Sequence, residues 1–139
     1  MLKKVVSGLV LLAVVCGVLF LTFQGPHETV SLSETVRMWV AKMGYSRGPL
    51  EFRSDFHLIE YFILGVVIAV FCKEMKWKPW IAGITGCCFG LAEETIKIFL
   101  PTREFGRIDL IKDFIGVWVA VAIVHGVSRI KKSREDGNE

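Results

Sequence analysis

Four carboxylates stand within or at the edge of apolar stretches in the second half of the chain: Glu60, Glu93, Glu94 and Asp113. Ionisable groups are costly in a low-dielectric surrounding, and they persist there where they pair, line a polar recess or meet a ligand. Paired carboxylates with a nearby His57 can also perform general acid–base chemistry. These residues therefore indicate a binding pocket or, alternatively, an enzyme in which Glu93, Glu94 and His57 would be catalytic.

Basic residues follow these carboxylates closely enough to pair with them. Lys97 stands one helical turn after Glu93, and the further candidate partners are Lys112, Arg103, Arg107 and His57. A purely structural ion-pair network that fixes helix register is the alternative interpretation. Such networks add little stability over apolar packing, so we expect a functional pocket.

Helical periodicity places the charged residues on faces that pack against other helices. At about 100° per residue, they share an arc of each helical wheel with glycine or aliphatic residues. Gly86-x-x-x-Gly90 is a spacing that lets membrane helices approach closely. The three arcs are Gly83, Gly86, Gly90, Glu93, Glu94 and Lys97; Asp109, Lys112, Asp113, Gly116 and Ala120; and His57, Glu60, Tyr61, Leu64 and Ile68.

The depth of each carboxylate along its helix agrees with the inward direction of the face on which it lies. Glu93 stands about seven residues, or roughly 10 Å, inside the outer end of its helix. Glu60 and Asp113 stand about five residues inside theirs. We therefore expect the four carboxylates near one level of the membrane.

The elements that position these residues are membrane helices. Hydrophobic residues make up 53% of the 139 residues, and the mean hydropathy is +0.50. Four apolar runs are long enough to span a membrane, at roughly 20 residues per crossing. They lie at about 5–23, 56–72, 80–100 and 108–127. The first has no A-x-A-like cleavage site after it and is predicted to be an uncleaved anchor. We expect one all-α membrane domain over 1–139, with four transmembrane helices and a basic tail at 128–139.

The distribution of lysine and arginine predicts the orientation. Nine lie beside helix ends on the side of the termini, and six lie on the other side. The positive-inside rule therefore places both termini in the cytoplasm.

The loop between the first two runs, 24–54, contains an amphipathic pattern. Ser31 with Glu34 fits a capping box, and Gly44 fits a helix stop. Between them the sequence predicts a short amphipathic helix in the outer interface, or one that packs on the bundle. Its apolar stripe is Leu32, Val36, Trp39, Val40 and Met43.

The sequence shows no signal for binding of nucleic acid, a metal or a cofactor. The net charge of +3 is small and scattered, so we expect no nucleic-acid partner. The four cysteines show no CxxC or Cys/His spacing, so neither a metal site nor a cofactor is predicted.

Four blocks of the chain resemble those of VanZ-like proteins. Residues 57–65 read H-L-I-E-Y-F-I-L-G, similar to the H-F-x-x-Y-F-x-L-G segment of that family. The later blocks D-E-x-x-Q, P-x-R and D-x-x-x-D/N-x-x-G correspond to 93–97, 101–103 and 109–116, in the same order and spacing. The resemblance covers about 52–127. The chain departs from the pattern at Ile96-Lys97, where the family has His-Gln, so Lys97 adds a positive charge beside Glu93.

The resemblance implies a multi-pass protein of the bacterial cytoplasmic membrane whose named relatives confer low-level resistance to teicoplanin-type glycopeptides. It implies no known reaction. The first hypothesis is a protein in the lipid bilayer that binds an envelope component, a lipid-linked cell-wall precursor or a glycopeptide antibiotic, from outside.

Two other functions stay open. One is a membrane-embedded enzyme that acts on a lipid-linked cell-wall intermediate. The other is a subunit of a larger complex or a helix-mediated oligomer, suggested by the small size and the glycine stripes. Arg103 is expected at the outer mouth, where a guanidinium can hold a carboxylate or phosphate. The predicted binding residues are His57, Glu60, Tyr61, Glu93, Glu94, Lys97, Arg103, Asp109 and Asp113.

Overall fold

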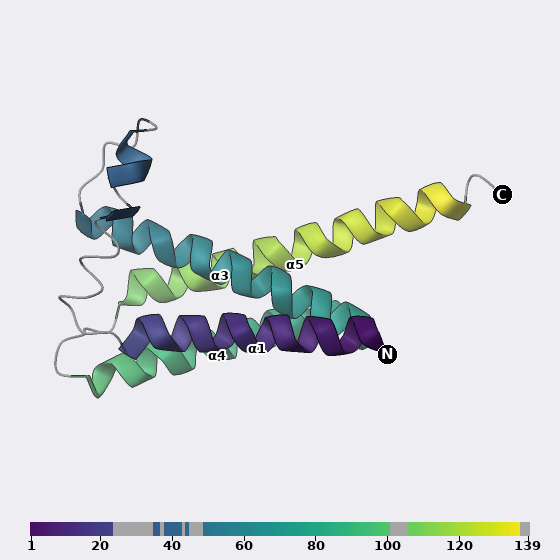
Figure 1. The fold of residues 1–139 in the computed structure, drawn as a ribbon, viewed down its shortest axis with the longest axis horizontal. Coiled ribbons are helices and arrows are strands. Elements are labelled where there is room, and N and C mark those ends of the chain that lie inside the picture. The colour runs from purple at the N-terminus through teal and green to yellow at the C-terminus, as the bar shows by residue number, and fades with distance from the viewer. Residues whose placement is uncertain (24–34, 37, 43, 45–48, 101–105, 137–139) are drawn as a thin grey trace.

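The computed structural model describes residues 1–23, 35–36, 38–42, 44, 49–100 and 106–136. Four long helices run up and down through this part of the chain (Figure 1), and it contains no strand. They are α1 (Leu2–Phe23), α3 (Pro49–Glu74), α4 (Pro79–Ile98) and α5 (Arg107–Asp136). Both termini lie at one end of the molecule, here called the terminal end (Figure 1). At the opposite, distal end, α1 and α4 finish and α3 and α5 begin.

Three of the helices are long and apolar enough to cross a membrane. They are α1, the Asp55–Glu74 part of α3, and α5. The prediction of apolar membrane helices is confirmed at this level. By composition α4 does not qualify among the described helices, because Glu93, Glu94 and Lys97 fall within its 20 residues.

Two glycines bring α3 and α5 into backbone contact. A Cβ added at Gly116 would lie 2.7 Å from the carbonyl oxygen of Leu58 and 3.0 Å from the amide nitrogen of Phe62. One added at Gly65 would lie 2.9 Å from the Cα of Val117. No side chain fits at either position without moving a helix, so small residues set this crossing.

The Gly86-x-x-x-Gly90 stripe of α4 works differently from the prediction. It was expected to let two helix backbones approach. Instead, Gly86 leaves space for the side chain of Val117, and Gly90 leaves space for the ring of Tyr61, 3.1 Å from the Cβ position. The stripe therefore receives side chains from α5 and α3.

The predicted inward face of α4 is confirmed. All six residues of the α4 arc, from Gly83 to Lys97, are buried. Further from the distal end, the seam between helices becomes an apolar core in which α3 and α5 contribute most of the buried residues. Its members include Leu64, Ile68, Ala69, Val117 and Val121.

By contrast, α1 covers the bundle loosely. Only Val18 and Thr22 are buried in it, while Leu12 is 60% exposed and Phe20 is 64% exposed. It packs mainly along α3. An apolar helix with this much exposed side-chain surface suits contact with lipid.

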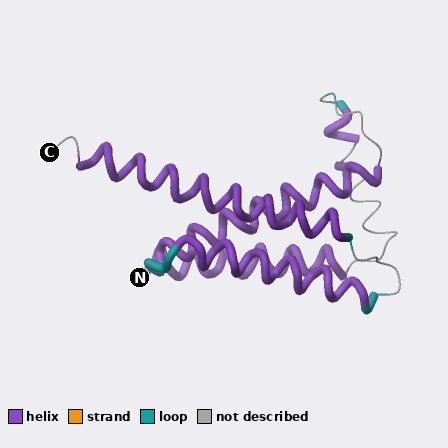
Figure 2. Tube along the Cα trace, turned by 180° about the vertical axis from the view of Figure 1, so that it is seen from behind, coloured by secondary structure: helices purple, strands orange, loops and turns teal. Residues whose placement is uncertain are grey.

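The helix boundaries extend beyond the apolar runs. α5 continues to Asp136, through most of the predicted tail at 128–139, and its last part leaves the other helices (Figures 1 and 2). Lysine, arginine and glutamate, which are common in this tail, are good helix formers. Lys131 Nζ also lies 4.0 Å from Oε1 of Glu135, one turn later. α3 likewise begins early, at Pro49, because proline is favoured in the first turn of a helix.

The predicted amphipathic helix falls mostly outside the described residues. Residues 35–36 and 38–41 are helical. Gly44 has a φ of 98°, which suits a helix stop. The full helix from Ser31 to Met43 stays a prediction.

Candidate functional site

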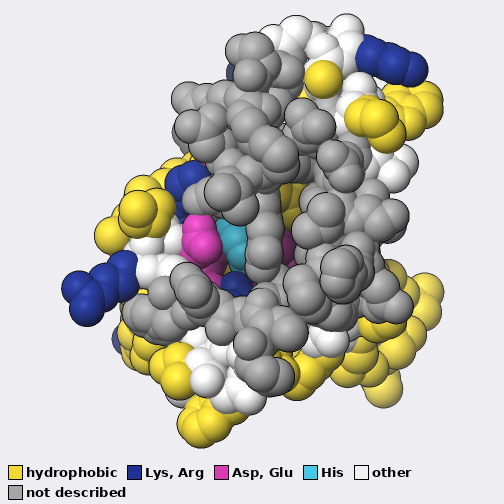
Figure 3. Space-filling view, turned by 90° about the vertical axis from the view of Figure 1, so that its left-hand side faces the viewer, with side chains coloured by type: hydrophobic (Ala, Val, Ile, Leu, Met, Phe, Trp, Pro, Cys, Tyr) yellow, Lys and Arg dark blue, Asp and Glu magenta, His cyan; other side chains and the backbone are white. Residues whose placement is uncertain are grey.

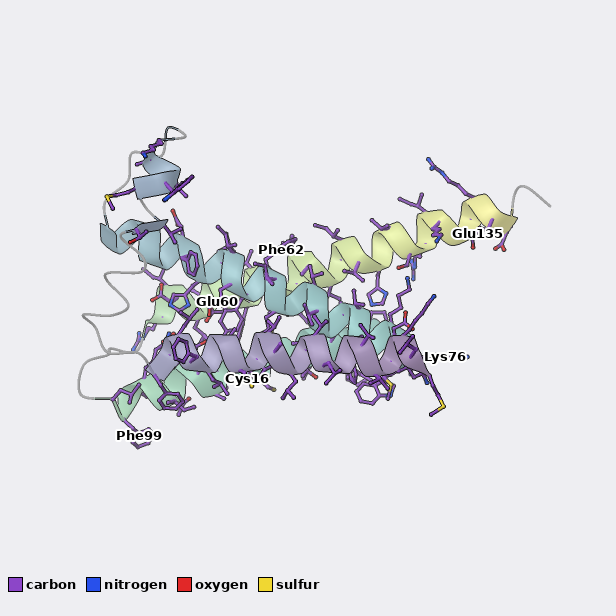
Figure 4. All side chains as sticks on the ribbon, viewed as in Figure 1. Cys16, Glu60, Phe62, Lys76, Phe99 and Glu135 are labelled. Atoms are coloured by element: carbon purple, nitrogen blue, oxygen red, sulfur yellow. The ribbon has the colours of Figure 1, made fainter. Side chains whose placement is uncertain are left out.

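Three helices meet at Gly90, near the distal end. A Cβ there would lie 3.1 Å from the Tyr61 ring of α3 and 3.4 Å from the Cβ of Asp113 in α5. Polar side chains surround this meeting point, and Figure 4 shows one of them, Glu60, in the distal half of α3. We call the set the polar cluster: His57, Glu60, Tyr61, Glu93, Glu94, Lys97 and Asp113.

The polar cluster is buried although it is charged. Glu93, Glu94, Lys97 and Asp113 are each at most 3% exposed. In a space-filling view from the distal end, acidic side chains and a histidine are visible (Figure 3).

One part of the cluster, the paired half, has its carboxylates fully engaged. Lys97 Nζ lies 3.2 Å from Glu93 Oε1 and also bonds Glu94 Oε1. Tyr61 Oη donates to Glu93 Oε2 at 2.5 Å. The Gly106 amide donates to Glu94 Oε2 at 2.9 Å. Each oxygen of both glutamates has a donor, so this half ties α3, α4 and the start of α5 together.

The other part, the open half, consists of His57 and Asp113, with Glu60 beside them. His57 Nδ1 lies 3.8 Å from Glu60 Oε2 and 3.8 Å from Asp113 Oδ1. Both distances are too long for a hydrogen bond. Within the described part of the chain, neither carboxylate oxygen of Asp113 nor Nδ1 of His57 has a hydrogen-bond partner. A contact of this length between buried polar atoms leaves a place for a bridging group.

The rim of the site carries a separate ion pair. Lys112 Nζ bonds Asp55 Oδ1 at 2.9 Å, joining α5 to α3. Asp109 stands half-buried in the first turn of α5, where the helix dipole favours a carboxylate. Asp55 was not among the predicted site residues, because it stands just before the second apolar run and shows no pattern of its own.

The structure brings seven of the nine predicted binding residues into the polar cluster. Glu60, Glu93 and Asp113 lie near one level, as the helical depth predicted, and Lys97 pairs with Glu93 as expected. Asp109 lies at the rim. Arg103 lies outside the described residues. The amide of Gly106 was missed, because a backbone donor carries no signal in the sequence.

Cysteine, histidine and carboxylate side chains do not form a metal site in the part of the chain that the structure describes. The acid–base hypothesis is changed by the geometry. Each oxygen of Glu93 and Glu94 already has a donor, whereas neither oxygen of Asp113 nor Nδ1 of His57 has one among the described residues.

No family model, curated protein or solved structure matches this chain. The chemistry of the site follows from its own geometry. One half is a closed ion-pair network, and the other contains buried polar atoms of Asp113 and His57 that have no hydrogen-bond partner among the described residues.

Proposed function

We propose that this chain is a multi-pass protein of the bacterial cytoplasmic membrane that binds a polar ligand in the open half of the cluster. The observation that carries the proposal is Asp113, which is 1% exposed and has no hydrogen-bond partner for either oxygen among the described residues. Leaving a buried carboxylate unpartnered is costly. Within membrane helices, such groups mark functional sites.

We further propose that α4 is a fourth crossing. Its 20 residues extend about 30 Å, the thickness of the hydrocarbon core. Its charged residues are buried against α3 and α5, while its exposed residues include Ile84 and Leu91. Its composition therefore understates how apolar its lipid-facing surface is.

The cluster is proposed to open to the outside. Basic residues concentrate at the terminal end, among them Lys3, Lys4, Lys73 and Lys131, which favours a cytoplasmic location for that end. An alkaline phosphatase fusion at Lys132 should then be inactive. A fusion that is active outside the cell would reverse the orientation and close the route to the cluster from the envelope.

The ligand is proposed to be a glycopeptide or a cell-wall precursor, as the resemblance to VanZ-like proteins implies. Expression of the chain in a susceptible Gram-positive host should raise the inhibitory concentration of teicoplanin. Asp113→Asn should abolish the rise at an equal level of membrane protein, while Glu135→Gln, at the exposed far end of the same helix, should not. If the natural chain gives no rise, the resistance role fails. If Asp113→Asn keeps the full rise, the open half is not the site.

Arg103 stays a predicted contact for an anionic group of the same ligand. A guanidinium binds a carboxylate or phosphate through two parallel hydrogen bonds, which lysine cannot reproduce. Arg103→Lys should therefore lose much of the resistance. Full resistance in Arg103→Ala would remove the residue from the site.

A second candidate function is acid–base catalysis on a lipid-linked cell-wall intermediate. It is favoured by His57, whose Nδ1 faces carboxylates from α3 and α5 at equal distance, an arrangement that can move a proton. The purified protein, incubated with lipid-linked precursor, should then form a product that is absent with His57→Gln. A precursor pool left chemically unchanged would leave binding as the function.

A further inference from the structure

A groove runs between α1 and α3 at the terminal end, opposite to the end that holds the polar cluster. The two helices lie side by side along it (Figure 1). Its volume is about 510 Å³, within the range of ligand-binding pockets in proteins. The apolar part of its lining consists mainly of valines from both helices: Val6, Val10, Val66, Val67 and Val70.

The groove has a polar end and an apolar end. α1 and α3 run in opposite directions, so Lys3 and Glu74 lie at the terminal end while Val10 and Val66 lie deeper. From Val66 to Glu74 the lining extends about 12 Å, at 1.5 Å per residue. The hydrocarbon core of a bilayer is about 30 Å thick. The groove therefore covers most of the depth of one leaflet, with its charged residues at the membrane surface.

This depth suits an acyl chain better than a helix. A partner helix that crosses the membrane needs an apolar seam through the whole hydrocarbon core, whereas this groove ends near the middle. An acyl chain of a lipid extends through one leaflet, from the headgroup to the middle of the bilayer. The exposed valine side chains, such as Val6 at 50%, provide the apolar wall that such a chain requires.

Two side chains of opposite charge line the polar end, Lys3 on α1 and Glu74 on α3. Neither forms an ion pair or a side-chain hydrogen bond with a described residue. The hydroxyl of Ser7, which also lines the groove, donates to the backbone oxygen of Lys4 at 3.1 Å. A lysine ammonium donates to a phosphate, and a carboxylate accepts from an ammonium. A headgroup that carries both a phosphate and a primary ammonium therefore matches these two side chains.

We propose that the groove binds a phospholipid of the phosphatidylethanolamine class. One acyl chain lies along the valines, the phosphate lies at Lys3 and the ammonium lies at Glu74. A headgroup with a phosphate and no ammonium would leave Glu74 unpaired and be repelled by it. A quaternary ammonium has no N–H group to donate. The groove and the polar cluster lie at opposite ends of the molecule, so this lipid is distinct from the ligand proposed for the open half.

Native mass spectrometry of the full chain tests the choice of headgroup. The protein is released from mixed micelles that contain equal amounts of phosphatidylethanolamine, phosphatidylcholine and phosphatidylglycerol, and the retained lipid is identified by its mass. One phosphatidylethanolamine per chain should be retained. Glu74→Gln should weaken its retention by roughly three- to tenfold, the effect of one hydrogen bond at a partly exposed site. Glu135→Gln, which removes an exposed carboxylate of α5, should retain it like the natural chain.

Val10→Phe tests the apolar part of the groove. The larger side chain fills the groove and should release the lipid, whatever its headgroup. Val119→Phe on α5 is the matched control, because Val10 and Val119 are both 46% exposed, and it should retain the lipid.

Three results would overturn the proposal. Equal retention of the three lipids by the natural chain would refute the choice of headgroup. Full retention in Val10→Phe would place the lipid elsewhere on the protein. A lipid-free dimer that Val10→Phe dissociates would show that a second copy of the chain covers the groove.

Discussion

Both halves of the polar cluster contain buried carboxylates, Glu93 and Glu94 in the paired half and Asp113 in the open half, but these differ in how they are satisfied. In the paired half, Lys97, Tyr61 and the Gly106 amide engage every oxygen of Glu93 and Glu94. In the open half, Asp113 is just as buried and has no hydrogen-bond partner among the described residues. The difference separates stability from function: substitutions in the first half should unfold the protein, and those in the second should disable it.

The largest effect is expected for Lys97→Met. It removes the shared cation and leaves two buried carboxylates beside each other, which should destabilise the protein by about 3–5 kcal/mol. Unfolding by SDS titration in mixed micelles measures this. Lys131→Met, at a position that is 78% exposed by side chain, is the control and should leave stability unchanged. An equal, small effect of both substitutions would show that the paired half does not hold the helices together.

Tyr61→Phe should have the next largest effect. It removes the hydroxyl that donates to Glu93 Oε2 and keeps the ring that fills the space at Gly90. A hydrogen bond to a charged group contributes about 1.5–3 kcal/mol, and the same titration should detect its loss. Phe62→Tyr, on the neighbouring position of α3, checks that aromatic exchange alone is tolerated. A Tyr61→Phe protein as stable as the natural chain would remove this bond from the account of the paired half.

Gly116→Ala is expected to cost about 1–3 kcal/mol, typical of overpacking in a close-packed seam. The added Cβ would lie 2.7 Å from a backbone oxygen of α3, so the two helices must separate. Gly17→Ala in α1 is the matched control, because nothing lies within 4 Å of its Cβ position. If both variants melt at the same temperature, the backbone contact between α3 and α5 does not limit stability.

Much of the site could be predicted from the sequence, because helical periodicity is a strong constraint. Residues three or four apart share a face, so Glu93, Glu94 and Lys97 had to point the same way as Gly86 and Gly90. The up-and-down arrangement of the helices then brought the carboxylates of three helices to one end. These arguments need only the period and the direction of each helix.

The division of the cluster into two halves could not be predicted. It depends on which oxygen atom each donor bonds, and the rotamer of one side chain decides that. The hydrogen bond from Gly106 to Glu94 depends on the path of the chain before α5. The backbone contact at Gly65 was missed because one glycine in an apolar helix has no distinguishing pattern.

The most direct test of the two-half account compares the stability and the ligand response of one variant, Asp113→Asn. The substitution keeps the shape of the side chain and removes a buried charge that has no donor in the described structure, so stability should stay the same or rise. Teicoplanin resistance should be lost. A variant that unfolds as readily as Lys97→Met, or one that keeps its full ligand response, would contradict the account.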